Sequence, residues 1–336
     1  MASSPCSVFV PGKYTVQLKS VEAGTKKARH VSSVSAPPRK PPLIATPFEE
    51  GEYPTLLLLH GFMLHNTFYS ELIQHIASHG FIVVVPQLYL VATCDSTNGI
   101  KSAAKTTDWL KDGLQDVLPT KVRPDLKKLG LSGHSRGGKD AFALALGYAK
   151  TTLSFSALIG IDPVDGVRKG HQTNPPVLNY IPHSLELKMP SLVIGTGLGE
   201  LKRNLFACAP KGVNHQDFYD ECSSPSCHFV AKDYGHMDML DDHTDGPRGI
   251  VSYCMCRNGE SRTPMRLFVG GIVVAFLKAC LQGDKQDLRA LKDNPEISNI
   301  NLSIVDFYDP DGTLTKYFDG GSISTPHYAV QESHQQ

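Results

Sequence analysis

The chain has 336 residues, of which 33 are Lys or Arg and 33 are Asp or Glu, so its formal net charge is zero. This balance lacks the basic excess that is typical of a nucleic-acid-binding surface. A hydrophobic content of 41% with 20% charged residues is typical of a globular protein and excludes general disorder. A chain of this length buries about 75% of its unfolded surface, enough for a central sheet covered by helices.

Apolar runs of strand length alternate with amphipathic helical segments along the chain. We expect strands over residues 14–21, 42–47, 55–59, 81–85, 129–131, 156–161, 191–194 and 228–231. Helices are expected over residues 68–77, 100–118, 138–148 and 263–281. Strands that are apolar throughout and alternate with helices are typical of a mostly parallel sheet buried on both faces. The sequence therefore predicts an α/β fold.

The domain organisation follows from the same pattern. The sequence contains no internal repeat and no break in composition, so we expect one domain over residues 14–282. Residues 1–13 are expected to form an N-terminal extension, and residues 283–336 a partly disordered C-terminal extension. The longest uncharged apolar run, 81–94, contains Pro86 and Gln87 and is shorter than the ~20 residues of a membrane span. We therefore expect no transmembrane segment.

Features of the N-terminus bear on the compartment. No basic start followed by an apolar block is present, so we expect no secretory signal. Residues 26–40 are basic, Ser-rich and Pro-containing, as organelle transit peptides are, but the strand expected at 14–21 leaves only a short presequence before the fold. The sequence is thus compatible both with import into an organelle and with its absence.

Five cysteines fall within one stretch of about fifty residues. The intervals Cys254-Met-Cys256 and Cys222-x4-Cys227 fit the paired ligand spacing of zinc sites poorly. We expect local disulfides or buried thiols here and no metal bound by the protein. Disulfides, if they form, argue against a reducing compartment.

The strongest motif is Gly133-His134-Ser135-Arg136-Gly137, which matches G-x-S-x-G. It follows a short apolar strand and precedes an Ala- and Leu-rich helix, the context in which the motif positions a nucleophilic serine. Glycines at 133 and 137 remove the Cβ atoms that would collide in such a tight turn. We therefore expect Ser135 to be a nucleophile.

A serine nucleophile needs a general base. His236 follows the strand expected at 228–231 and the turn Asp233-Tyr-Gly235, so it reaches back over the sheet edge. His243 is the alternative, although it lies in an acidic run that is typical of a solvated surface. His134, beside the serine, is expected to pack rather than to react. We expect His236 to be the base.

The acid should lie between the serine and the histidine in the chain. Asp162 ends the strand after the elbow helix and is the preferred residue. Asp165, three residues later, and Glu200, after the strand at 191–194, remain alternatives.

An oxyanion hole needs two backbone donors. We expect the amide of Arg136, directly after the serine, and the amide of Phe62, in the loop after the strand at 55–59. Met63 is the alternative to Phe62 as the second donor. Met63 and Leu64 are also expected to line the substrate site. Phe68, although close by in sequence, is expected to pack in the core.

Stretches of sequence longer than the serine motif make a resemblance to one protein family specific. The chain resembles plant chlorophyllases over roughly residues 8–282. The strings that carry the resemblance are Gly133-His-Ser-Arg-Gly-Gly138, Ile161-Asp-Pro-Val-Asp-Gly166, Val193-Ile-Gly-Thr-Gly-Leu-Gly-Glu200, Asn214-His215, Lys232-Asp-Tyr-Gly-His-Met-Asp-Met-Leu-Asp241, Pro11-Gly-Lys-Tyr-Thr-Val16 and Phe268-Val-Gly-Gly-Ile-Val-Val274.

This resemblance implies an α/β-hydrolase fold and a serine esterase that cleaves the phytyl ester of chlorophyll. It implies the triad Ser135, Asp162 and His236, which strengthens Asp162 over Glu200. The alternatives are a lipase, a cutinase-like enzyme or a phospholipid acetyl hydrolase on the same scaffold, and a non-catalytic pigment-binding protein.

The resemblance also bears on ligands and compartment. It implies chlorophyll as the substrate, and since the magnesium belongs to that substrate, no cofactor is expected. Peripheral contact with a membrane is compatible with such a substrate, whereas no nucleic-acid partner is expected. Chlorophyll as substrate favours the chloroplast, with the cytosol, endoplasmic reticulum or a vacuole-associated location as alternatives.

Overall fold

The computed structural model describes residues 7–21, 41–89, 93–203, 205–223 and 225–309. Within these ranges a nine-stranded sheet has the order β1-β2-β4-β3-β5-β6-β9-β10-β11. Its strands are β1 (Val16–Ser20), β2 (Leu43–Pro47), β3 (Gly51–Leu59), β4 (Ile82–Val85), β5 (Val122–His134), β6 (Ala157–Ile161), β9 (Ser191–Thr196), β10 (Ser226–Ala231) and β11 (Leu302–Tyr308). A separate hairpin pairs β7 (Gly166–Arg168) with β8 (His171–Gln172).

The middle of the sheet is parallel and its edges are antiparallel. Strands β4, β3, β5, β6, β9 and β10 run in one direction. At one edge β2 is antiparallel to β4 and β1 is antiparallel to β2, and at the other edge β11 is antiparallel to β10. Each strand expected from its apolar run is present, within a few residues at most ends. The carboxyl ends of the parallel strands therefore share one edge, where α/β proteins place their ligands.

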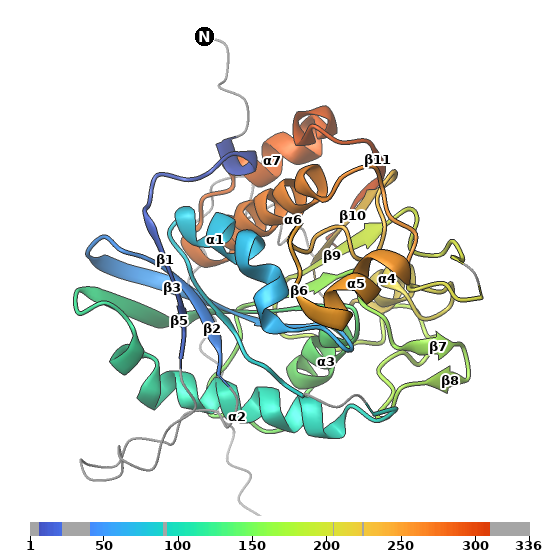
Figure 1. Ribbon diagram of the computed structural model, residues 1–336, viewed down its shortest axis with the longest axis horizontal. Coiled ribbons are helices and arrows are strands. Elements are labelled where there is room, and N and C mark those ends of the chain that lie inside the picture. The colour runs from blue at the N-terminus through green and yellow to red at the C-terminus, as the bar shows by residue number, and fades with distance from the viewer. Residues whose placement is uncertain (1–6, 22–40, 90–92, 204, 224, 310–336) are drawn as a thin grey trace, which may run out of the picture.

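Helices cover both faces of the sheet (Figure 1). One face carries α1 (Ser70–Ser78), α6 (Arg262–Leu277) and α7 (Gln286–Asp293), and the other carries α2 (Thr97–Gly113), α3 (Arg136–Ala145) and α4 (His215–Glu221). Helix α5 (Gly246–Cys254) precedes α6. Short helical turns are η1 (Ser7–Phe9), η3 (Asn66–Tyr69), η4 (Gln115–Val117), η5 (Lys278–Gln282) and η6 (Pro295–Ser298).

The core is divided by the sheet into two clusters, as an alternation within β3 illustrates. Leu56 and Leu58 pack against α1 and α6, whereas Leu57 and Leu59 pack against α2 and α3. A strand that is apolar at every position is therefore buried on both sides. This arrangement confirms the predicted α/β class and matches the α/β-hydrolase fold that the resemblance implies.

One helical stretch within the described residues, Arg262–Gln282, is long and apolar enough to cross a membrane by length and composition alone. However, 78% of its most apolar window is buried inside the protein. Its side chains pack on β-strands, on α1 and on η1. The stretch has the packing of a core helix.

The C-terminal part departs from the expected domain boundary. We expected the domain to end at 282, but α7 buries Leu288 and Leu291 completely against the core, and β11 is the last strand of the main sheet. Phe307 of β11 packs on Phe229 of β10 with ring centroids 5.6 Å apart. Scattered apolar residues in 283–309 were too few to predict a strand, because an antiparallel edge strand needs only one apolar face. Of the extension expected over 283–336, the part up to 309 is thus ordered, and residues 310–336 lie outside the described ranges.

At the other end of the chain, part of the expected N-terminal extension also packs on the fold. Residues 7–9 form η1, and Val8 and Phe9 are buried against α6. The remainder of that extension, residues 1–6, lies outside the described ranges.

The buried leucines of α7 allow a test of its place in the fold. We expect Leu288→Ala and Leu291→Ala each to lower the free energy of unfolding by about 2–5 kcal/mol, because each leaves a cavity in the core. Gln286→Ala, at an exposed position of the same helix, should change it by less than about 0.5 kcal/mol. Chemical denaturation monitored by circular dichroism measures these values. Equal, small effects at all three positions would contradict the conclusion that α7 is part of the folded core.

Candidate active site

The turn between β5 and α3 carries Ser135. Its backbone has φ 58° and ψ −125°, a conformation that costs strain for a residue with a side chain. The turn is held by three backbone hydrogen bonds: Ser135 N–H donates to Ile161 O, and Ser135 O accepts from Lys139 and Val164. These bonds from β6, the loop after it and the first turn of α3 keep the serine at the carboxyl edge of the sheet.

Close backbone contacts explain the glycines of the motif. A Cβ atom on Gly133 would lie 2.0 Å from Gly137 O, and one on Gly137 would lie 2.3 Å from Leu59 O. Any larger residue would push α3 away from β5 or from the end of β3. The predicted reason for both glycines is thus visible in the packing.

His236 reaches the serine from the loop after β10. Its Nε2 lies 2.8 Å from Ser135 Oγ, and its ring is 2% exposed. The loop is shaped by Asp238, whose Oδ2 accepts from the N–H groups of Gly235 and Gly259, each at 2.6 Å. A Cβ atom on Gly235 would lie 1.8 Å from Arg257 O, so only glycine fits before the histidine.

Asp162 holds the other side of the imidazole. Its Oδ2 lies 2.7 Å from His236 Nδ1 and accepts a second hydrogen bond, of 2.6 Å, from Thr196 Oγ1. The side chain is fully buried at the end of β6, with φ 42°. Burial acts to raise the pKa of Asp162, but the hydrogen bond from His236, the electrostatic effects of His236 and His215 and the hydrogen bond from Thr196 together outweigh it, so this pKa lies below its usual value. The carboxylate is therefore ionised beside the imidazole at neutral pH.

The alternative acids and base lie elsewhere. Asp165 is buried and accepts hydrogen bonds from the backbone of Val177 and Leu178, so it organises the loop that follows β8. Glu200 is exposed and accepts from Asn214 Nδ2 at 2.8 Å. His243 is exposed as well. The contact with His236 thus belongs to Asp162.

The acidic run around His243 is less solvated than we expected. Asp241 is only 5% exposed, and its two oxygens accept from the N–H groups of Ser70 and Glu71 at the start of α1. Asp242 forms an ion pair with Arg266. Sequence alone could not reveal these partners, because they lie far from the run in the chain.

The loop after β3 lies against the nucleophile. A Cβ atom on Gly61 would lie 3.2 Å from Ser135 Cβ. Gly61 O accepts from His60 Nδ1 at 2.8 Å and from Leu64 N–H at 3.3 Å. Gly61 C=O and Phe62 N–H belong to the same trans peptide and so point in opposite directions. The N–H of Phe62 therefore points away from His60 Nδ1 and Leu64 N–H. The Arg136 guanidinium lies 4.6 Å from the centre of the Phe62 ring, which joins the two residues expected to supply oxyanion amides.

The residues expected near the substrate differ in exposure. Phe62 is 40% exposed and Met63 is half-buried, with φ 60°. Leu64 is 3% exposed and packs in the cluster with α1, as does Phe68. Phe68 is therefore a core residue, as expected, and Phe62 and Met63 present more surface to a ligand than Leu64 does.

Two residues of the site were missed in the sequence. Thr196 supports the acid, and its signal was a polar residue at the end of the apolar run 191–194. His134 was expected only to pack, yet both of its ring nitrogens are hydrogen-bonded. A histidine buried completely, as His134 is, needs partners for its polar atoms, but the sequence alone cannot name them.

Two segments flank the triad residues. Loop 197–210 packs on the acid, since a Cβ atom on Gly199 would lie 3.2 Å from Asp162 Oδ2. The disulfide Cys208–Cys256 fastens this loop to the segment after α5. This is one of the outcomes expected for the cysteine-rich stretch; Cys222 and Cys227 are free, buried thiols, the other expected outcome.

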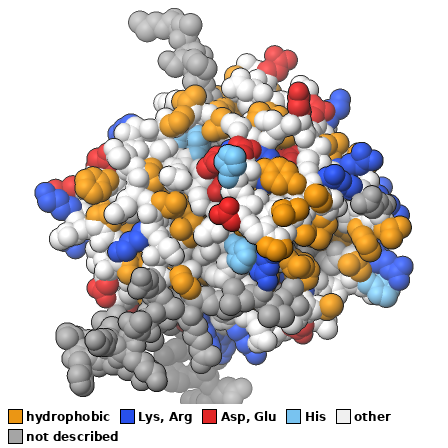
Figure 2. Space-filling model, in the orientation of Figure 1, with side chains coloured by type: hydrophobic (Ala, Val, Ile, Leu, Met, Phe, Trp, Pro, Cys, Tyr) orange, Lys and Arg blue, Asp and Glu red, His pale blue; other side chains and the backbone are white. Residues whose placement is uncertain are grey.

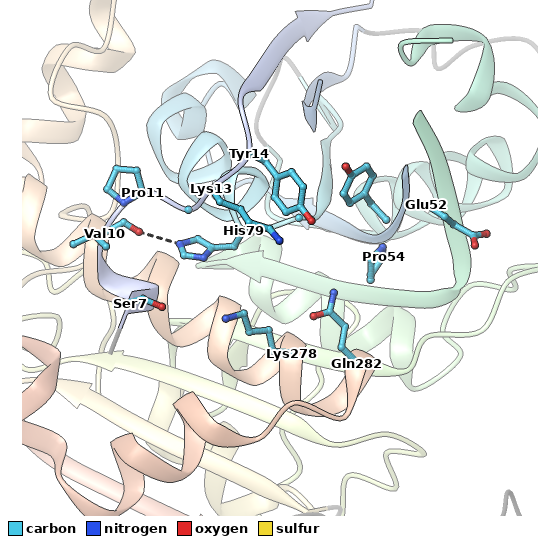
Figure 3. Close-up of a pocket in the computed structure, with 13 residues that line it drawn as sticks. Ser7, Val10, Pro11, Lys13, Tyr14, Glu52, Pro54, His79, Lys278 and Gln282 are labelled. Carbon is cyan, nitrogen blue, oxygen red and sulfur yellow. Dashed lines mark hydrogen bonds between the residues drawn. The ribbon is translucent and has the colours of Figure 1, made fainter. Parts of the chain in front are cut away.

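A cavity of about 500 Å³ lies at the opposite edge of the sheet (Figure 3). Its lining comes from the segment before β1, the first residues of β3, the turn before β4 and η5 after α6. These lining residues include Tyr14, Glu52, His79, Lys278 and Gln282. His79 Nε2 is bonded to Val10 O across it. None of the triad residues lines this cavity, so it is separate from the site around Ser135.

Comparisons with known proteins identify the family. The family model described as Chlorophyllase matches residues 4–309. Chlorophyllase-2 of Arabidopsis thaliana is 55% identical over 300 residues, covering 87% of this chain and 94% of the relative. Chlorophyllase-1 of the same plant is 48% identical, covering 81% and 86%. Chlorophyllase-1, chloroplastic, of Citrus unshiu is 43% identical, covering 94% and 93%. These matches confirm the resemblance found in the motifs: the chain belongs to the chlorophyllase family.

Proposed function

We propose that this protein hydrolyses the phytyl ester of chlorophyll to chlorophyllide and phytol, with Ser135, His236 and Asp162 as its catalytic triad. The observation that carries the proposal is the continuous hydrogen-bonded line from Ser135 Oγ through His236 to Asp162, with distances of 2.8 and 2.7 Å. Membership of the chlorophyllase family supports the substrate.

The first half of the reaction forms an acyl-enzyme. Ser135 Oγ attacks the ester carbonyl carbon, and His236 Nε2 takes the hydroxyl proton as general base. Asp162 stabilises the imidazolium that results. The carbonyl oxygen becomes an oxyanion, which the amides of Phe62 and Arg136 stabilise. The bond to the phytol oxygen then breaks, and His236 returns its proton to that oxygen.

The second half releases the acid. Water attacks the acyl carbon while His236 takes a proton from it, and the bond to Ser135 Oγ breaks as the serine recovers its proton. The products are the carboxylic acid of the tetrapyrrole and the free alcohol. No step needs a metal bound by the protein, since the magnesium belongs to the substrate.

A surface beside the triad supports contact with a membrane, where a phytylated substrate resides. Large apolar side chains are exposed on loop 197–210 and on α5 and the residue after it: Leu201, Leu205, Phe206, Ile250, Tyr253 and Met255. We call this set the apolar rim. Figure 2 shows hydrophobic side chains gathered over α5 and beside it, with basic side chains at the margin.

The two halves of the apolar rim form one unit. Arg203 Nη1 donates to the carbonyls of Tyr253 and Cys256, and Arg257 Nε donates to Lys202 O. Lys202 and Arg257 are exposed, so the margin suits an anionic lipid surface. The segments that carry the rim pack on the site, because Gly199 lies against Asp162 and Arg257 lies against Gly235, the residue before His236. We therefore expect a lipid surface bound at the rim to lie on the side of the molecule that carries Ser135.

The compartment follows from the substrate. We place the protein in the chloroplast, because chlorophyll occurs there. The relative from Citrus unshiu that is named chloroplastic supports this location at 43% identity.

The reaction is tested by identifying products. Incubation with chlorophyll should yield chlorophyllide and phytol, and Ser135→Ala should lower turnover by several orders of magnitude with substrate binding retained. Chromatography measures both products. Turnover of short-chain nitrophenyl esters with no cleavage of chlorophyll would instead favour a lipase or cutinase-like activity. Full turnover by Ser135→Ala would exclude the triad.

The acid is tested by a pair of isosteric substitutions. Asp162→Asn should lower kcat by about 10³- to 10⁴-fold, because the amide cannot stabilise the imidazolium or hold its tautomer. Glu200→Gln, the matched control, should change kcat less than about threefold, because its carboxylate contacts Asn214 instead. Steady-state kinetics on a soluble nitrophenyl ester measure both. A larger loss of kcat in Glu200→Gln than in Asp162→Asn would indicate Glu200 as the acid of the triad.

The apolar rim is tested with vesicles of phosphatidylcholine and phosphatidylglycerol. Leu205→Asp and Phe206→Asp should each weaken vesicle binding by about 10-fold or more, because burying one such side chain contributes about 1.5–3 kcal/mol. Phe48→Asp, 62% exposed just beyond β2 at the opposite sheet edge, is the control. Co-sedimentation in the Ser135→Ala background measures binding. Unchanged binding in both rim variants would exclude this surface.

A further inference from the structure

A buried line of hydrogen bonds connects the parts of the site behind the triad. Gly61 N–H lies 3.0 Å from Tyr69 Oη, Tyr69 Oη lies 2.7 Å from His134 Nδ1, and His134 Nε2 lies 2.9 Å from His236 O. Tyr69 and His134 are fully buried. The line therefore joins Gly61 in the loop after β3 to Tyr69 at the end of η3. From there it continues through His134, the residue before Ser135, to the backbone of His236.

The direction of each bond follows from its end groups. His236 O is a carbonyl and can only accept, so His134 Nε2 carries a hydrogen. Burial, with the nearby His236, lowers the pKa of His134 to about 3, so the ring is neutral and its Nδ1 accepts. Tyr69 then donates its hydroxyl hydrogen to Nδ1, and its oxygen accepts from Gly61 N–H. Burial raises the pKa of Tyr69, which keeps that hydroxyl protonated.

A second connection closes the line into a ring. Asp241, five residues after His236, accepts from the N–H groups of Ser70 and Glu71, and its own N–H donates to Phe68 O. The segment that carries the base is thus bound to the residues on either side of Tyr69. Displacing Tyr69 or His134 would therefore shift His236 relative to Ser135 and to the Gly61–Phe62 peptide.

We propose that Tyr69 and His134 are positioning residues, which set the distance between the general base and the oxyanion loop through this hydrogen-bonded line. The inference rests on the proposed function, because it assigns a role relative to the proposed triad. Neither residue contacts the reacting atoms of the ester.

The neutral state of His134 also matters during the reaction. The rings of His134 and His236 have centroids 4.8 Å apart. When His236 takes the serine proton it becomes a cation, and a second cation at this distance would disfavour that step. The bond from Tyr69 to Nδ1 occupies the lone pair that would otherwise accept a proton. Tyr69 thus holds His134 in the tautomer that donates to His236 O.

Substitutions separate the two bonds of His134. Tyr69→Phe removes the hydroxyl and keeps the ring, and His134→Leu removes both hydrogen bonds. We expect each to lower kcat on a soluble nitrophenyl ester by about 10- to 100-fold with KM changed less than about threefold. His134→Gln can still donate to His236 O and should recover most of the loss in His134→Leu. Because both act through one line, Tyr69→Phe/His134→Leu should be no slower than His134→Leu.

Matched controls remove buried hydrogen bonds elsewhere. Tyr53→Phe removes a bond of 3.0 Å from a buried tyrosine to Glu49 O, and His75→Leu removes a bond of 2.7 Å to Val8 O. Both should lower stability without lowering kcat per active site. End-point labelling with a fluorophosphonate counts active sites, so that unfolded protein does not enter kcat.

The outcomes are distinct. Unchanged kcat per labelled site in Tyr69→Phe and His134→Leu, or equal losses in the controls, would overturn the positioning role. Loss of kcat with no recovery in His134→Gln would also overturn it, since the bond to His236 O would then be irrelevant. Retained labelling and turnover in Ser135→Ala would instead overturn the proposed function.

Discussion

The close approach of three backbone segments at Ser135 is the constraint on which the rest of the site depends. The end of β3, the end of β5 and the start of α3 meet so tightly that Gly133 and Gly137 have no room for a side chain. This contact forces Ser135 into its strained conformation and presses the Gly61 loop against it. The packing of α3 on the ends of β3 and β5 therefore positions both the proposed nucleophile and the loop that is proposed to supply one oxyanion amide. A strain of this kind persists only because the surrounding sheet and helices over-determine it.

The remaining groups are held by polar bonds that bridge loops. Asp162 receives bonds from both His236 and Thr196, so the orientation of the imidazole depends on β6 and β9 together. Behind the imidazole, Asp238 shapes the loop from one side. Tyr69 and His134 support it from the other. In a buried site each of these bonds is worth more than at the surface, because an unpaired polar group there is costly.

The segments around the triad explain how one scaffold can act on a large apolar ester. The disulfide Cys208–Cys256 and the bonds from Arg203 bind loop 197–210 to the end of α5, although the two are far apart in the chain. The exposed apolar side chains of the apolar rim stand on this unit, whereas the opposite edge of the sheet carries the cavity of Figure 3 and none of the triad. The chemistry and the apolar surface thus share one end of the molecule.

Local patterns in the sequence predicted eight of the nine strands of the main sheet and the three residues of the proposed triad. Apolar runs predict strands because a strand buried on both faces needs apolar residues at every position, and G-x-S-x-G predicts a nucleophile because only glycine fits its turn. The sequence by itself therefore predicted the α/β class and pointed to Ser135, His236 and Asp162, whose side chains the structure places within hydrogen-bond distance of one another. Only the tertiary structure decided that β11 belongs to the sheet, that Cys208 pairs with Cys256, and that Tyr69 and His134 join the oxyanion loop to the base. Those features depend on which residues distant in the chain become neighbours, and no local pattern of apolar or polar residues specifies that.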